Sequence, residues 1–73
     1  MNTELKIKSY PKSEFAQLYF PESDPHVALN HLNSWIRRCQ PLVDALEACY
    51  QSRHAKFFSA QAVRHIIHYL GEP

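Results

Sequence analysis

The sequence is poor in the features that most often reveal the activity of a small protein. Its 73 residues contain a single glycine, Gly71, so no glycine-rich loop is present to hold a phosphate. It has no HExxH motif and no catalytic carboxylate pair, and Cys39 and Cys49 stand ten positions apart without CxxC spacing. We therefore expect no enzymatic activity, no metal ion and no cofactor, and no small-molecule substrate is evident.

Long apolar runs and a secretory signal pattern are also missing from the sequence. A membrane-spanning helix needs about 20 consecutive apolar residues, and no stretch approaches that length. Two cysteines without a disulfide pattern suit a reducing compartment. The sequence therefore predicts a cytoplasmic protein with no membrane partner.

The charge balance is close to neutral. Eight basic and seven acidic residues give a net charge of +1, and the isoelectric point is about 7.9. Dedicated nucleic-acid domains are usually more basic, with isoelectric points above about 9. Any positive patch must therefore arise from local segregation of charge. An apolar content of 45% with nine aromatic residues excludes a disordered chain and predicts one folded domain over residues 1–73.

The segment from Asp24 to Cys39 carries the clearest pattern. Asp24 is a candidate helix N-cap, and Pro25 suits the first helical position because its missing N–H would have no partner there. At about 100° per residue, one arc of this helix is apolar and predicts a core face, with Trp35 at its edge. The apolar arc comprises Ala28, Leu29, Leu32, Trp35, Ile36 and Cys39; the polar arc comprises His26, Asn30, Asn33, Ser34, Arg37 and Arg38, and contains no acidic residue.

The remaining segments predict short elements around this helix. A period-2 pattern predicts an N-terminal strand over Leu5–Ser9 that Pro11 ends, and its natural partner is an aromatic strand at Lys56–Phe58. Apolar spacing predicts three further helices, and Ser59 and Gly71 are expected to cap the last one. These helices are expected over Pro11–Tyr19, Leu42–Tyr50 and Ala60–Leu70. The fold class is mainly α: a helix-turn-helix-like bundle of about four helices with a short two-stranded β ribbon.

The polar arc of Asp24–Cys39 has the residue types of a DNA-recognition helix. Amide side chains can pair with adenine edges, and arginines can contact guanine or phosphate. A cluster at Arg53, His54 and Lys56 would suit a wing that contacts the phosphate backbone. We expect double-stranded DNA binding in transcription regulation, through His26, Asn30, Asn33, Ser34, Arg37, Arg38, Arg53 and Lys56. Convergence of Arg37, Arg38, Arg53 and Lys56 on one face, with Lys12 as a further candidate, would favour this function, and interleaved Glu14, Glu22 or Glu47 would count against it.

Other interpretations of these residues stay open. A polar helix face is equally typical of plain solvent exposure, and the turn before Asp24 is longer than usual for a helix-turn-helix. His65 and His68 have the i, i+3 spacing of two metal ligands but lack further ligands at suitable spacing. The main alternative function is a non-enzymatic protein-interaction module, as a homodimer or with another protein. It predicts an exposed aromatic patch around Tyr19, Phe20 or Tyr69.

The chain also resembles a known family of short bacterial proteins, the domain-of-unknown-function family DUF4248. The resemblance covers nearly everything after residue 9 and rests mainly on apolar and turn residues: Tyr10, Glu14–Ala16, Leu18–Pro21, Ala28, Leu32, Trp35–Ile36, Phe58–Ser59, Val63 and Leu70–Pro73. It implies a fold and no particular chemistry. The segment Tyr10–Ala16 with the following leucine and tryptophan helix is also similar to MerR-like and excisionase-like winged domains, which implies DNA binding by analogy only.

Overall fold

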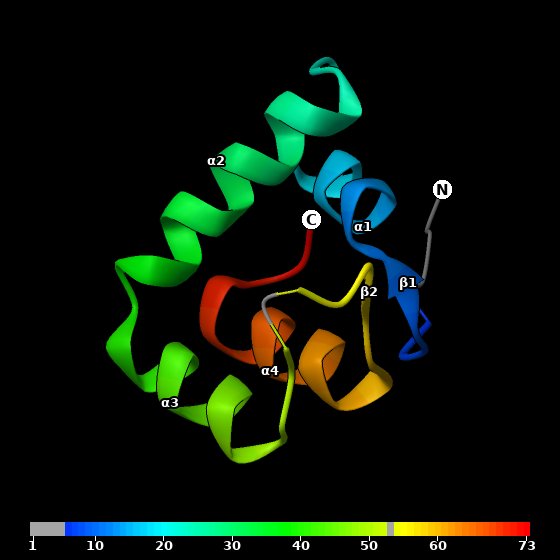
Figure 1. Ribbon diagram of the computed structural model, residues 1–73. Coiled ribbons are helices and arrows are strands. Elements are labelled where there is room, and N and C mark those ends of the chain that lie inside the picture. Colours follow the sequence, from blue (N-terminus) through cyan, green and yellow to red (C-terminus); the bar gives the residue numbers. More distant parts are fainter. Residues whose placement is uncertain (1–5, 53) are drawn as a thin grey trace.

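Four helices and one small β ribbon form the described part of the chain (Figure 1). The structure is a computed structural model that describes residues 6–52 and 54–73. The elements follow in the order β1 (Tyr10–Pro11), α1 (Lys12–Tyr19), α2 (Pro25–Arg37), α3 (Gln40–Ala48), β2 (Phe57–Phe58) and α4 (Ala60–Leu70). The predicted class, mainly α with four helices and a short antiparallel ribbon, is confirmed.

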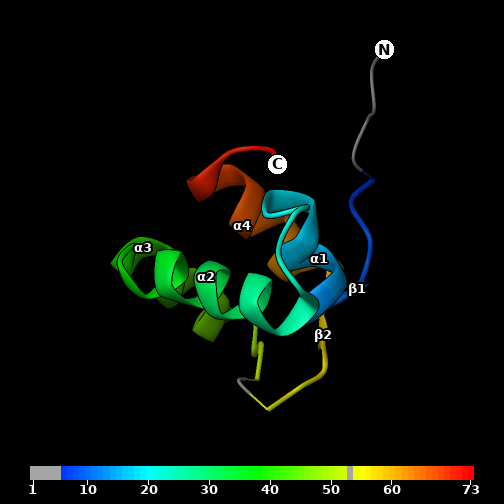
Figure 2. The same ribbon diagram turned by 90° about the horizontal axis from the view of Figure 1, so that it is seen from above.

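The helices pack around one core. α1 lies along α2, and α3 contacts both α2 and α4, so that α4 closes the bundle (Figures 1 and 2). Phe15 of α1 is fully buried, and its ring centroid lies 5.4 Å from Tyr10, 5.6 Å from Tyr19 and 5.7 Å from Phe58. Such tilted and edge-to-face pairs contribute beyond the burial of area. This aromatic cluster ties α1 to the ribbon and to the end of the chain.

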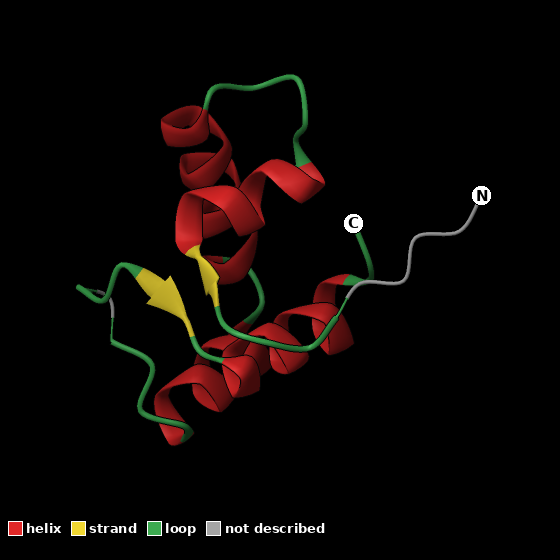
Figure 3. Ribbon diagram, turned by 90° about the vertical axis from the view of Figure 1, so that its right-hand side faces the viewer, coloured by secondary structure: helices red, strands yellow, loops and turns green. Residues whose placement is uncertain are grey.

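The ribbon differs from its prediction in position. Tyr10 pairs with Phe58 and Pro11 with Phe57 in an antiparallel register (Figure 3), whereas the strand was expected to end before Pro11. Residues 6–9 are not in a strand, and Leu5 lies outside the described residues. Proline is tolerated at an edge strand because a donor that faces away from the partner is not needed. The period-2 pattern therefore predicted the wrong residues for the first strand.

The ends of α2 are close to their predicted positions, but the N-cap differs in detail. Asp24 has extended backbone angles, and its carbonyl oxygen accepts the N–H of Ala28 at 2.8 Å, yet its carboxylate makes no capping hydrogen bond. The predicted side-chain cap is thus wrong. At the other end, the N–H of Arg38 is shared between the carbonyl oxygens of Ser34 and Trp35, and this tightened turn ends the helix before Cys39.

α3 ends two residues earlier than predicted. The N–H of Tyr50 bonds to the carbonyl of Glu47, and that of Gln51 to the carbonyl of Leu46, both at 3.0 Å, which is the Schellman pattern. This termination holds Tyr50 in the left-handed region, with φ 63°, where glycine is usual. Tyr50 is 92% exposed, so it does not face inward. Leu46 is buried as predicted, and so is Leu42.

α4 matches its predicted bounds at both ends. The Ser59 hydroxyl accepts the N–H of Ala62 at 3.1 Å, as expected of an N-cap. Gly71 has a φ of 91° and donates its N–H to the carbonyl of Ile67 at 2.9 Å. Its own carbonyl oxygen accepts the Tyr19 hydroxyl at 2.6 Å, which ties α1 to the end of α4.

Candidate nucleic-acid interface and the adjoining groove

α2 has a buried row with a different surface on each side of it. Ala28, Leu32 and Ile36 form the buried row. Successive residues turn by about 100°, so the residues on either side of this row point in opposite directions. On one side, Leu29, Asn33 and Arg37 border a groove, and we call them the groove flank. On the other side lie His31 and Trp35, which we call the aromatic flank.

The predicted DNA-binding residues of α2 divide between the groove and open solvent. Asn33 and Arg37 belong to the groove flank, whereas His26, Asn30 and Arg38 are exposed and do not line the groove. Ser34 is half-buried on the helix. The polar arc is therefore accessible, and its edge at Asn33 and Arg37 borders the groove.

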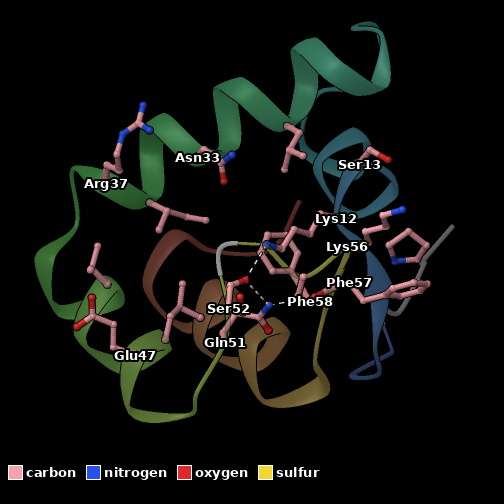
Figure 4. A pocket seen from close by; sticks show the side chains of 16 residues that line it. Lys12, Ser13, Asn33, Arg37, Glu47, Gln51, Ser52, Lys56, Phe57 and Phe58 are labelled. Carbon is pink, nitrogen blue, oxygen red and sulfur yellow. Dashed lines mark hydrogen bonds between the residues drawn. The ribbon is translucent and has the colours of Figure 1, made fainter.

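The groove has a volume of about 750 Å³ and lies between α2, α3 and residues 51–58 (Figure 4). Its apolar side chains are Pro11, Leu29, Ile36, Val43, Leu46, Ala55, Phe57 and Phe58, and its polar ones are Lys12, Ser13, Asn33, Arg37, Glu47, Gln51, Ser52 and Lys56. Apolar side chains thus supply much of its surface, and charged groups reach it from α1, α2, α3 and the loop before β2.

The loop that forms one wall of the groove is held by hydrogen bonds. The Lys12 backbone N–H donates to the Lys56 carbonyl, and the Lys12 ammonium donates to the Ser52 carbonyl, each at 3.0 Å. The Gln51 side-chain amide donates to the Phe57 carbonyl at 3.0 Å and accepts the Ser59 N–H at 3.0 Å. These bonds hold Gln51, Ser52, Lys56 and Phe57 against α1 and the ribbon.

Lys12 brings a positive charge into the groove. Its Nζ lies 5.3 Å from the centroid of the Phe58 ring, in a cation–π arrangement, and its side chain points toward Ser52 (Figure 4). Burial lowers the pKa of Lys12 from its ordinary value, because a desolvated ammonium loses hydration that the neutral amine does not need. The ammonium group is therefore partly desolvated beside an apolar surface.

The predicted convergence of charges is found for some residues and not for others. Arg37 and Lys56 line the same groove, and Lys12 joins them, but Arg38 does not. Arg53 lies outside the described residues. Glu47 is the one acidic residue that lines the groove within residues 6–52 and 54–73. Three cations and one carboxylate therefore border the groove, and the interleaved Glu47 is a feature that counts against DNA.

The aromatic flank corrects the prediction that Trp35 lies in the core. Trp35 is 41% exposed, and its ring packs edge-on against Phe20 at 4.8 Å and Tyr19 at 6.2 Å. The His31 ring lies 5.2 Å from that of Phe20. Trp35 stands at the edge of the apolar arc of α2, where the end of α1 and the following turn cover only one side of the ring. Leu32 and Ile36, nearer the centre of the arc, are buried as predicted.

The histidines and cysteines form no metal site in the part of the chain that the structure describes. No three histidine, cysteine, aspartate or glutamate side chains come together there. His68 is exposed and its ring stacks edge-on against Tyr69, with 4.8 Å between the centroids. Cys39 and Cys49 are free thiols and are only partly buried, so Cys39 is less buried than its place on the apolar arc predicted. No described helix has the length and apolar character needed to cross a bilayer.

Fold and surfaces together define a small helical domain in which a helix pair, a third helix and a β ribbon surround an open groove. A family model described as a domain of unknown function (DUF4248) matches residues 6–73. The chain therefore belongs to this family, as the resemblance predicted, and the family description names no activity. Neither the curated proteins nor the solved structures gave a match. The likeness to MerR-like and excisionase-like domains stays a prediction.

Proposed function

We propose that this domain binds double-stranded DNA, as a regulator or accessory factor. α2 would lie along the major groove, and Lys56 would contact the phosphate backbone. The observation that carries the proposal is that the exposed arc of α2 has no acidic residue and that Lys56 borders the same surface as Asn33 and Arg37. Amide and guanidinium groups on a helix are the groups that read base edges, and a nearby lysine supplies phosphate contact.

Electrostatics supports this orientation locally although the whole chain is nearly neutral. Arg37 and Lys56 come from α2 and from the loop before β2, so their charges add on one side of the domain. Glu47 opposes them from α3. Binding through these groups is therefore weak and salt-dependent, because few phosphates are neutralised.

An NMR titration of the full ¹⁵N-labelled chain with a mixed-sequence duplex at low salt tests the proposal. We expect amide shifts at His26, Asn30, Arg37 and Lys56. The double variant Arg37→Ala/Arg38→Ala should lower the affinity by roughly tenfold or more and reduce the salt slope by about 1 for each lost phosphate contact.

Two further variants sharpen that titration. Glu47→Gln removes the one opposing carboxylate that the described groove contains and should raise the affinity for DNA. Arg64→Ala removes an exposed cation from α4, outside the groove, and serves as the matched control with unchanged affinity. Shifts confined to residues outside α2 and the loop, or equal losses in the Arg64 and Arg37 variants, would refute DNA binding through this face.

The aromatic flank favours a second candidate function, a protein-interaction module. Trp35 and Tyr69 are each 41% exposed, and Tyr19 and Phe20 are half-buried beside Trp35. Exposed tryptophan and tyrosine side chains are common anchors of protein interfaces. Association with a second copy is the simplest case, and sedimentation velocity over a range of concentrations measures it. Concentration-dependent association that Trp35→Ala abolishes, together with no response to DNA, would replace the first proposal by the second.

A further inference from the structure

We propose that the groove between α2, α3 and residues 51–58 is a binding site for a small apolar carboxylate, whose hydrocarbon part lies on Leu29, Val43 and Phe57 and whose carboxylate pairs with Lys12. The proposal does not require DNA binding. No local sequence pattern predicts this site, because its walls come from four separate segments.

The size and composition of the groove suit a small molecule. Its volume of about 750 Å³ falls in the range of roughly 300–1,000 Å³ that is typical of small-molecule sites. Such sites are mostly apolar with a few polar groups that set orientation. The side chains of Leu29, Val43 and Phe57 are all at least partly accessible, and they reach the groove from α2, α3 and β2 respectively.

The groove is also formed in advance. The Lys12–Ser52 hydrogen bond and the two bonds of the Gln51 side-chain amide hold Gln51 and Ser52 against α1 and the ribbon. A ligand therefore does not have to order this wall when it binds. Less conformational entropy is lost on binding to such a site than to a mobile one.

The charge of the groove selects an anion. Three cations and one carboxylate, Glu47, are among the described lining residues; Lys12 reaches across the groove toward Ser52, whereas Arg37 and Lys56 point outward at its rim (Figure 4). The Lys12 ammonium lies over the Phe58 ring and donates to the Ser52 carbonyl, and burial lowers its pKa, so a carboxylate placed beside it would add an ion pair that favours the charged form. A single negative charge on an apolar body fits this arrangement better than a polyanion, which Glu47 and the apolar floor would disfavour.

The same site would couple to DNA if the proposed function holds. Asn33, Arg37 and Lys56 belong both to the groove and to the proposed DNA face. A ligand bound in the groove would lie beside these three residues and would hinder the approach of a duplex to them. This coupling alone depends on the proposed function, since ligand binding is measured without DNA.

NMR titrations of the full ¹⁵N-labelled chain with octanoate and, separately, with 1-octanol test the site. We expect both probes to shift the amides of Leu29, Val43 and Phe57, and octanoate to bind about tenfold more tightly, the equivalent of about 1.4 kcal/mol. Lys12→Met keeps an unbranched side chain over Phe58 and should bring the two affinities close together. Arg64→Met is the matched control and should keep the tenfold preference.

Lys12→Met also removes a hydrogen bond to the loop, so a loss of binding could come from a displaced loop. A second variant therefore tests the groove without changing Lys12. Ala55→Phe places a larger side chain where Ala55 lines the groove and should abolish binding of both probes. Equal affinity of the wild type for octanoate and octanol, or undiminished binding by Ala55→Phe, would overturn the proposal. Shifts scattered over the surface rather than clustered at the groove would overturn it as well.

With DNA added, octanoate should weaken duplex binding by the wild type. Octanoate binding without any response to DNA would keep the ligand site and reject the DNA proposal. DNA binding without octanoate binding would keep the DNA proposal and reject the ligand site.

Discussion

The two flanks of α2 differ sharply although only one row of buried side chains separates them. On the groove flank, Asn33 and Arg37 stand over an open, partly charged groove, whereas on the aromatic flank Trp35 packs edge-on against Tyr19 and Phe20. The difference comes from the neighbours of the helix. α1 and its following turn fill the space beside Trp35, but the groove side faces α3 and a loop that stand further off. One amphipathic helix thus carries two distinct candidate surfaces.

Truncating a side chain of the buried row should destabilise the fold and so disrupt both flanks of α2. Leu32 is fully buried between the flanks, and Leu32→Ala should lower the free energy of unfolding by about 2–5 kcal/mol. Small domains have only about 5–15 kcal/mol in total, so both flanks should lose their order. Urea unfolding followed by circular dichroism measures this. Asn30→Ala, on the exposed arc, is the control and should change stability by no more than about 0.5 kcal/mol. A loss below about 1 kcal/mol at Leu32 would contradict the assigned core.

Changing one residue on each flank should separate stability from binding. Trp35→Ala should lower the free energy of unfolding by about 1–3 kcal/mol, less than a fully buried tryptophan would, because the ring is 41% exposed. It should leave octanoate binding unchanged. Arg37→Ala should alter stability by no more than about 0.5 kcal/mol but weaken DNA binding. Urea unfolding and the two titrations measure both effects. An equal effect of both substitutions on stability and on binding would show that the flanks are not independent.

The smallest expected effect is the dependence of folding stability on alkaline pH, which arises from Tyr19, the α1 residue that packs against Trp35 of the aromatic flank. Burial, and secondarily the negative charge of Glu72, raise the pKa of Tyr19 from 10.0 to about 12. The unfolded chain therefore ionises Tyr19 first, and folding stability is full below pH 10 and declines as the pH rises through about 12. The half-exposed ring and solvent screening keep this decline small.

Tyr19→Phe is the direct check on that pH dependence. It removes both the ionisable group and the hydrogen bond to the Gly71 carbonyl, at a loss of about 0.5–1.5 kcal/mol at neutral pH. Denaturation midpoints measured from pH 8 to pH 12 should fall less steeply for Tyr19→Phe than for the wild type. Tyr69→Phe, which removes a hydroxyl from an exposed ring, is the matched control. Identical slopes for wild type and Tyr19→Phe would exclude Tyr19 as the source.

Sequence patterns predicted the helices well because each depends on local signals. The 3.6-residue apolar spacing, Pro25 at the first turn of α2, and Ser59 and Gly71 at the ends of α4 act within a few residues of one another. Local signals could not predict the register of the ribbon. Tyr10 and Phe58 are paired because both rings pack against Phe15, and that contact joins segments that are distant in sequence.

The candidate site was predicted only in part for the same reason. Residue types on α2 pointed to Asn33 and Arg37, and the basic loop pointed to Lys56; Lys12 was named as a further cation of this face, but no local pattern placed it in a groove. The exposure of Trp35 also depended on how far α1 extends over it. Both outcomes are set by contacts between segments distant in sequence, and helical periodicity carries no information about those contacts.

The contacts that close the structure have a consequence for the order in which the domain is made. Lys12 bonds to Ser52, forty residues later, and Tyr19 bonds to Gly71, fifty-two residues later. During synthesis, which proceeds from the N-terminus, α2 is complete before Phe57 and Phe58 exist. The residues of the polar arc of α2 are therefore present in the nascent chain before those of the groove, and the proposed carboxylate site can form only after Phe57 and Phe58 have been added.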